Sequence, residues 1–145
     1  MKNLLLSLSL VMSLTNTLLA DKTPLKNQEL SSKEMQSQNI IIAKMFAEEI
    51  SKSLPHTIDK YTKLITVSNQ EATIIYTFEI NTGSKSDKTV IAEDQTRMKN
   101  TIKHGVCNSS MKFLESNINI SYIYTSAATT KKLFQFDITK EDCPI

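Results

Sequence analysis

The chain has 145 residues, of which 17 are Lys or Arg and 15 are Asp or Glu, which gives a formal net charge of +2. This near-neutral balance does not provide the strong positive field that attracts nucleic acids or anionic membranes. A single arginine, Arg97, argues further against recognition of phosphates or bases, and two glycines, Gly83 and Gly105, leave no glycine-rich phosphate loop. We therefore expect no cofactor and no nucleic-acid partner.

The first twenty residues have the order of a secretory signal peptide. Lys2 precedes a Leu-rich apolar stretch from Leu4 to about Leu14, and the small residue Ala20 precedes a charged pair. The stretch is shorter than the roughly 20 apolar residues that span a bilayer. We expect cleavage after Ala20 or nearby, no membrane anchor afterwards, a flexible lead over residues 21–30, and a location in the periplasm or outside the cell.

The two cysteines, Cys107 and Cys143, are expected to form one disulfide. Export places them in an oxidising compartment, where a pair of cysteines most simply bridges. A bridge at residue 143 would hold down a C-terminus that otherwise frays. The alternative, two free buried thiols, fits a cytosolic protein better.

Residues 31–145 are expected to form a single domain that begins with a helix. Ser31 and Glu34 have the spacing of a capping box, and Pro55 ends the helical run. Between them, apolar residues recur at spacings of three and four. The face expected to be buried consists of Met35, Ile42, Met45, Phe46 and Ile50.

After the helix, the pattern changes to the two-residue period of strands. Residues 57–68 place Tyr61, Ile65 and Val67 on one face, and a turn then leads into a second strand over 71–81. In the second strand, apolar and polar faces alternate. Its expected inward residues are Ala72, Ile74, Tyr76, Phe78 and Ile80. Together the two segments indicate a hairpin.

A second helix and a second hairpin follow. The helix is expected from Lys88 to about Cys107, with Asp87 as its cap, and a further helical turn near residues 109–116. The strands lie over 117–126 and 131–140. Their expected inward residues are Ile118, Ile120, Tyr122 and Tyr124 in the first and Phe134, Phe136 and Ile138 in the second.

The order helix, hairpin, helix, hairpin predicts an α+β domain. Two helices are expected to pack on one face of a four-stranded, mainly antiparallel sheet and to leave the other face exposed to solvent. The expected disulfide joins the end of the second helix to the end of the last strand. The pattern does not settle the order of the strands.

No arrangement of residues points to catalysis or to a metal. His56 lies three residues from Asp59 in an expected loop, and His104 lies near a helix end where a cation suits the dipole. Glu79 and Asp137 would form a carboxylate pair only if their strands were neighbours. The tyrosines and phenylalanines of the strands are expected to be core residues and not a ligand stack. We therefore expect no enzyme.

The polar face of the sheet is the candidate interaction surface, because it is low in charge and carries two isoleucines where polar residues are typical. Its residues are Thr73, Ile75, Thr77, Ser121, Ile123 and Thr125.

These features favour a small exported bacterial protein that acts by protein–protein interaction, as an accessory or adaptor of an envelope or secretion system. Its partner would be a protein of the cell envelope, and its oligomeric state is open. An inhibitor or immunity-type protein, using the loops at 56–59 or 81–88, is the first alternative. A small hydrolase or ligand carrier is the second, and it would need a concave pocket with converging polar groups.

Overall fold

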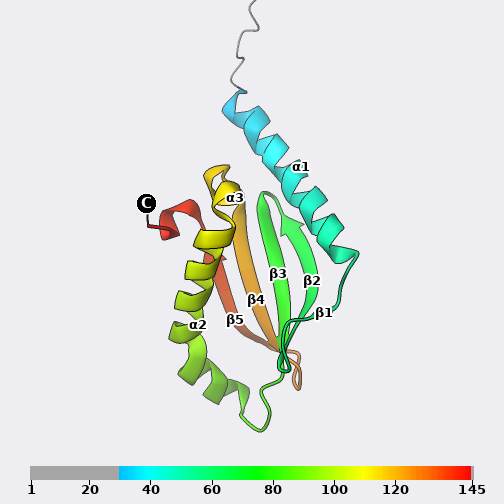
Figure 1. Cartoon of the computed structure of the whole chain (residues 1–145), viewed down its shortest axis with the longest axis vertical. Helices are drawn as coiled ribbons and strands as arrows, with labels where there is room; N and C mark the ends of the chain where they lie inside the picture. The colour runs from blue at the N-terminus through cyan, green and yellow to red at the C-terminus, as the bar shows by residue number, and fades with distance from the viewer. Residues whose placement is uncertain (1–29, 145) are drawn as a thin grey trace, which may run out of the picture.

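The computed structural model describes residues 30–144, and the expected signal peptide and most of the expected lead lie outside them. Two long helices lie on one face of a five-stranded sheet, as Figure 1 shows, so the expected α+β class is confirmed. The elements are α1 (Ser32–Ser51), β1 (His56–Thr57), β2 (Thr62–Gln70), β3 (Thr73–Ile80), α2 (Asp87–Ser109), α3 (Met111–Glu115), β4 (Asn119–Ser126), β5 (Lys132–Ile138) and the 3₁₀ helix η1 (Lys140–Asp142).

The sheet has the strand order β1-β2-β3-β4-β5, and it contains one strand more than the four expected. The additional strand, β1, has two residues, too few to produce a periodic pattern. All neighbours are antiparallel except β3 and β4, which run parallel, so α2 and α3 form the crossover between the two hairpins. The sheet is therefore mixed, and its parallel pair lies in its middle.

The segment expected as one strand over residues 57–68 is divided by a tight turn. The Asp59 carboxylate accepts hydrogen bonds from the backbone N–H groups of Tyr61 (2.7 Å) and Thr62 (2.9 Å), which folds β1 back on β2. Tyr61 is therefore 53% exposed and not on the inner face. A bulge between Leu64 and Thr66 shifts the alternation, so Leu64 and Val67 are the buried residues of β2.

Helix α1 begins with the expected capping box. The Ser31 hydroxyl accepts a hydrogen bond from the backbone N–H of Glu34, and the Glu34 carboxylate accepts one from the backbone N–H of Ser31. These bonds to Ser31 hold the pKa of Glu34 below its usual value.

The expected buried face of α1 is wrong for three of its five residues. The helix instead turns Asn39, Ala43 and Ala47 towards the sheet. The exposed fractions of the three others are 43% for Met35, 41% for Ile42 and 64% for Met45. Small side chains allow α1 to approach the sheet closely, and its N-terminal turns extend past the ends of the strands (Figure 1). The larger apolar side chains are therefore left without a partner in the described chain.

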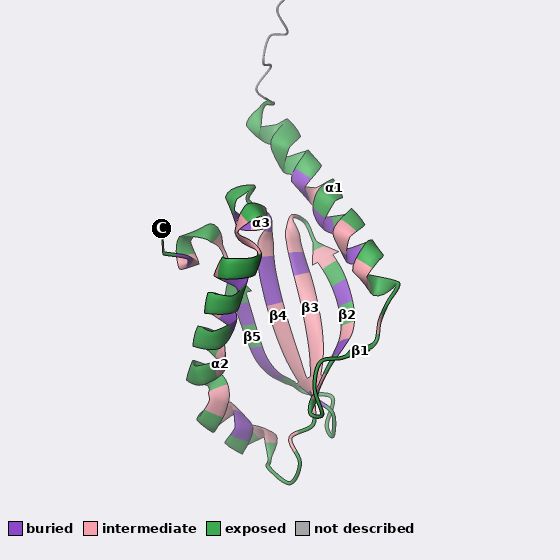
Figure 2. Cartoon of the chain, in the orientation of Figure 1, coloured by how far each residue is buried: buried purple, intermediate pink, exposed green. Residues whose placement is uncertain are grey.

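The most deeply buried side chains gather where α2, α3 and the sheet meet (Figure 2). The large apolar ones are Ile74, Val106, Leu114, Ile118, Ile120 and Ile138. Two contacts attach α1 to this region. The Asn39 side-chain amide donates a hydrogen bond of 2.5 Å to the Ser116 carbonyl, and the Phe46 ring packs edge to face on Phe113 with centroids 5.0 Å apart.

The disulfide between Cys107 and Cys143 is present, with Cα atoms 5.5 Å apart. It joins the last turns of α2 to the residue that follows η1. Beside it, the Asp142 carboxylate accepts hydrogen bonds from the backbone N–H and the hydroxyl of Thr139. The backbone bond in particular holds the pKa of Asp142 below its usual value.

Reduction of the disulfide is expected to lower the free energy of unfolding by about 4 kcal/mol, because the bridge closes a loop of 36 residues in the unfolded chain. Urea unfolding with and without reductant measures this difference. The double variant Cys107→Ser/Cys143→Ser is the control, since its midpoint should not respond to reductant. An equal midpoint for the native chain under both conditions would contradict the stabilising role.

Candidate functional site between the two long helices

Helices α1 and α2 diverge and leave part of the sheet uncovered. Helix α1 contacts β2 and β3, whereas α2 contacts β5, and the two helices do not pack along each other. Figures 1 and 2 show the middle strands β3 and β4 between them. The helix-facing side of these strands carries four aromatic residues, which we call the aromatic strip: Tyr76, Phe78, Tyr122 and Tyr124.

The parallel register of β3 and β4 builds the strip in two rows. Tyr76 lies opposite Tyr122, with ring centroids 5.1 Å apart, and Phe78 stacks on Tyr124 at 4.9 Å. All four rings are only half-buried, whereas Phe134 and Phe136 on β5 are buried beneath α2. The expectation that the aromatic residues are core therefore holds for β5 and fails in part for the strip.

The hydroxyl groups of the strip have no protein partner within residues 30–144. The hydrogen bonds of the described side chains do not include the hydroxyls of Tyr76, Tyr122 or Tyr124. No fully buried polar atom in this part of the chain lacks a partner, so solvent reaches these hydroxyls. Burial of the rings raises the pKa of Tyr76 and Tyr124 to about 12 and also raises that of Tyr122. The hydroxyls are therefore protonated at neutral pH and can donate.

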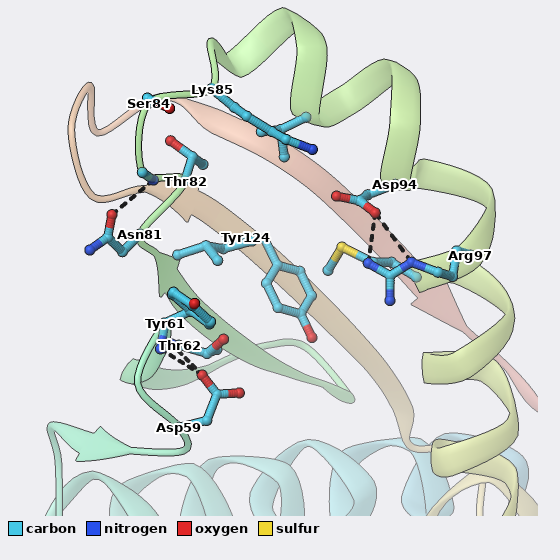
Figure 3. A pocket seen from close by; sticks show the side chains of 14 residues that line it. Asp59, Tyr61, Thr62, Asn81, Thr82, Ser84, Lys85, Asp94, Arg97 and Tyr124 are labelled. Carbon is cyan, nitrogen blue, oxygen red and sulfur yellow. Dashed lines mark hydrogen bonds and ion pairs between the residues drawn. The ribbon is translucent and has the colours of Figure 1, made fainter.

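A pocket of about 700 Å³ continues from the lower end of the strip. Its floor is Tyr124 and Ile80, one side is the turn at Asp59–Thr62, and the other is the first half of α2 with Arg97 and Met98. In Figure 3, the Tyr124 hydroxyl points into this hollow between Asp59 and the Asp94–Arg97 pair.

Short-range hydrogen bonds fix the loop that closes the pocket. The Asn81 side chain accepts a bond of 3.0 Å from the backbone N–H of Gly83, whose φ of 62° suits glycine. Ser86, and not the expected Asp87, caps α2 by accepting a bond from the backbone N–H of Thr89. Asp87 instead accepts a bond of 2.6 Å from the Thr129 hydroxyl, which ties the β4–β5 turn to the start of α2.

The charges around the pocket are paired with one another. The Arg97 guanidinium donates to the Asp94 carboxylate at 2.6 and 3.2 Å, and Lys85 pairs with Glu93. The hydrogen bond to Glu93 raises the pKa of Lys85. The Asp59 carboxylate accepts the two backbone hydrogen bonds of the turn between β1 and β2. The pocket therefore offers aromatic surface and neutral hydroxyl groups rather than an isolated charge.

The residues considered for chemistry do not come together. His56 is exposed on β1, and the His104 ring lies 3.2 Å from the side-chain nitrogen of Asn108 on the surface of α2. Glu79 and Asp137 are separated by β4, so they are not neighbours. Within residues 30–144, no group of three or more His, Cys, Asp and Glu side chains is placed to hold a metal ion. The geometry of the site suits binding.

The candidate interaction face predicted from the sequence lies on the opposite side of the sheet. The register pairs Ile75 with Ser121 and Thr77 with Ile123, so these residues share one face. Ser121 is buried and donates a 2.6 Å bond to Asp137, and Thr125 donates to the Phe78 carbonyl. Binding through this face remains a prediction. Its residues are Thr73, Ile75, Thr77, Ser121, Ile123 and Thr125.

The aromatic strip was not predicted from the sequence, because its exposure depends on which face of α1 meets the sheet. The residues that face the sheet from α1 are two alanines and an asparagine, while isoleucines and methionines lie elsewhere around the helix. A helix that exposes its larger apolar residues covers a sheet incompletely.

Residues 37–134 match the model of a family described as a domain of unknown function, DUF8479. The chain belongs to this family. The matched part begins in α1 and ends in β5, so it contains the whole aromatic strip. No curated protein matches the sequence.

Three solved structures share the fold. A Pseudomonas aeruginosa protein named as secreted is 12% identical, with a TM-score of 0.68, over 80% of this chain and 100% of that one. The pilotin EpsS of the Vibrio vulnificus type 2 secretion system is 14% identical, with a TM-score of 0.58, over 78% and 98% of the two chains. The type II secretion pilotin AspS of Vibrio cholerae is 14% identical, with a TM-score of 0.55, over 77% and 97%. At these identities the likeness shows the fold alone.

The tyrosines of the strip are expected to make stability depend on alkaline pH. Their pKa is raised in the folded state, so the stabilisation is present below pH 10 and is lost as the pH rises towards about 12. Chemical unfolding at a series of pH values measures this loss. The variant Tyr76→Phe/Tyr124→Phe should show a shallower decrease above pH 10 and the same slope as the native chain near pH 7. Equal slopes above pH 10 would contradict the raised pKa of Tyr76 and Tyr124 in the folded chain.

Proposed function

We propose that this protein is an exported accessory protein of a bacterial envelope or secretion system, and that it binds a helical segment of a partner protein on the aromatic strip. The observation that carries the proposal is the half-buried aromatic strip on the middle strands, which lies between two helices that do not pack along each other. Aromatic residues that a fold leaves partly exposed are enriched at protein–protein interfaces.

A partner helix can enter only where the two helices diverge. An inserted helix needs the axes of α1 and α2 to be about 16–20 Å apart, twice the 8–10 Å of a packed pair, whereas β2 and β5, beneath α1 and α2, are separated by three strand spacings, or about 14 Å. The helices diverge further towards the pocket (Figure 1). A helix of a partner would complete the layer that α1 and α2 leave open, with its apolar face on the strip.

The shared fold is consistent with this role. Two of the proteins with a similar structure are pilotins of type 2 secretion systems, and the third is named as secreted. The expected signal peptide would bring this chain to the periplasm or outside the cell. Among residues 30–144, no helix combines the length and the apolar character needed to cross a bilayer.

Two alternatives have observations in their favour. An inhibitor or immunity-type protein would use the loops at Asp59 and at Asn81–Lys85, which lie together at the pocket. A ligand carrier would use the pocket itself, whose volume is within the range of small-molecule sites. Native mass spectrometry of the protein from its own envelope fraction separates the carrier, which holds a small mass, from the other two, which hold a protein whose identity then tells an accessory role from inhibition.

A charge at the site is expected to weaken partner binding, whereas a charge on the opposite face should not. Met98→Lys and Tyr61→Lys place a cation at the pocket, and Ile75→Lys and Ile123→Lys place the same charge on the outer face. We expect at least about a tenfold loss of affinity for the co-purified partner from the first pair, because a lysine there must be desolvated.

Thermal unfolding of all four variants is the control for folding. Loss of binding from the outer-face pair alone, with the melting temperature unchanged, would contradict the site and would support the face predicted from the sequence.

A further inference from the structure

We propose that a second pocket, at the opposite end of the sheet from the one beside Tyr124, binds an uncharged oligosaccharide through side-chain amide groups. This site is separate from the aromatic strip and does not depend on the proposed function.

The second pocket lies between the first turns of α1, the β2–β3 turn and the loop that leads into β4, and its volume is about 550 Å³. It includes Thr73 at the start of β3, whereas the pocket beside Tyr124 includes Ile80 at the end of that strand. Helix α1 extends past this end of the sheet and forms one wall (Figure 1). The amide side chains that line the pocket are Gln36, Asn39, Asn117 and Asn119.

Asn39 presents an unpaired polar atom to the second pocket. Only 6% of Asn39 is exposed, and its side-chain nitrogen donates a hydrogen bond of 2.5 Å to the Ser116 carbonyl. The side-chain oxygen Oδ1 has no partner within residues 30–144, and no fully buried polar atom in this part of the chain lacks a partner. Solvent therefore reaches Oδ1. Because Asn39 lines the pocket, a ligand there can donate a hydrogen bond to this oxygen.

The other three amides belong to backbone that is held in place. Gln36 lies within α1, the N–H of Asn117 donates to the Leu114 carbonyl, and the N–H of Asn119 donates to the Ala72 carbonyl, the last two at 2.9 Å. The side chains of these three residues make no hydrogen bond to another described residue, so their donors and acceptors are available. A fixed backbone lowers the entropy cost of ordering these groups around a ligand.

The charges of the second pocket argue for a neutral ligand. No Lys, Arg or His of the described chain lines it, so a phosphate or a carboxylate would lose its water without meeting a cation. The one charged residue, Glu71, is exposed and attracts a cation only weakly. An apolar ligand would cover the amides and leave them unpaired, which is unfavourable. A neutral ligand rich in hydrogen-bonding groups avoids both costs.

Sugar hydroxyls match this lining. A hydroxyl donates and accepts, as an amide does, so neighbouring hydroxyls of one ring can pair with the oxygen and the nitrogen of a single side chain. Leu30 and Met35 are 46% and 43% exposed at the same pocket and can cover the C–H face of a ring. The volume is within the range of small-molecule sites.

An extended peptide fits the second pocket less well. Such peptides bind by pairing their main chain with a free strand edge. Here the start of β3 is already paired on both sides, because Thr73 lies opposite Gln70 of β2 and opposite Asn119 of β4. The pocket therefore offers side-chain amides rather than an open ladder of backbone groups.

Titration of the isotope-labelled chain with two neutral trisaccharides, chitotriose and maltotriose, tests the site. NMR shifts of the side-chain NH₂ group of Asn117 report binding at the pocket. The variant Gln36→Leu/Asn119→Leu replaces two amides with apolar groups of similar size. The matched control Asn100→Leu makes the same change at an exposed amide of α2, outside this pocket. Asn39 is left unchanged because its hydrogen bond holds α1.

We expect at least one trisaccharide to bind the native chain and Asn100→Leu equally, and to bind the double variant at least about tenfold more weakly. Melting temperatures control for folding. If the double variant melts lower, Gln36→Leu alone, on the exposed surface of α1, takes its place with an expected loss of about threefold.

Equal binding by the native chain and the variant that lacks the amides would overturn the assignment of the site. No binding of either sugar, or tighter binding of tri-alanine or of inorganic phosphate, would overturn the class of ligand. Either failure leaves the proposed function standing, because the aromatic strip shares no residue with the second pocket.

Discussion

The parallel pairing of β3 with β4 is the constraint on which the rest of the structure depends. It joins the two hairpins in the middle of the sheet, and it requires the chain to cross from one end of the sheet to the other through α2 and α3. The same register sets Tyr76 beside Tyr122 and Phe78 beside Tyr124. The connection and the aromatic strip are therefore two consequences of one pairing.

The attachment of the helices explains why the strip stays uncovered. Helix α1 is held through Asn39 and Phe46 to α3 and the loop after it, and it approaches the sheet through alanines. Helix α2 is held by the disulfide near its C-terminus and by Asp87 at its first residue, and it lies over β5. Neither helix can cover the middle strands without giving up these contacts. A third element is needed to complete the layer, and we infer that a partner supplies it.

The sequence was sufficient for features that depend on neighbouring residues. Periodicity identified both long helices and both hairpins, and the capping box at Ser31 and the disulfide at Cys107 followed from spacing and compartment. It was insufficient where the outcome depends on distant contacts. The turn held by Asp59 took Tyr61 off the inner face, the bulge at Ile65 shifted the alternation of β2, and the exposure of Met45 follows from how closely α1 approaches the sheet. Tyr122 fits the alternating pattern of a buried strand residue. Its partial exposure depends on where the helices attach, which the pattern does not show.

Site-specific photo-crosslinking in the native cell tests the central claim most directly. A benzophenone amino acid replaces Met98 at the pocket in one strain and Ile123 on the opposite face of the sheet in another. The account predicts a crosslink from position 98 to a single segment of one envelope protein, with an apolar helical pattern, and none from position 123. A crosslink from position 123 alone would place the binding surface on the other face and contradict the account.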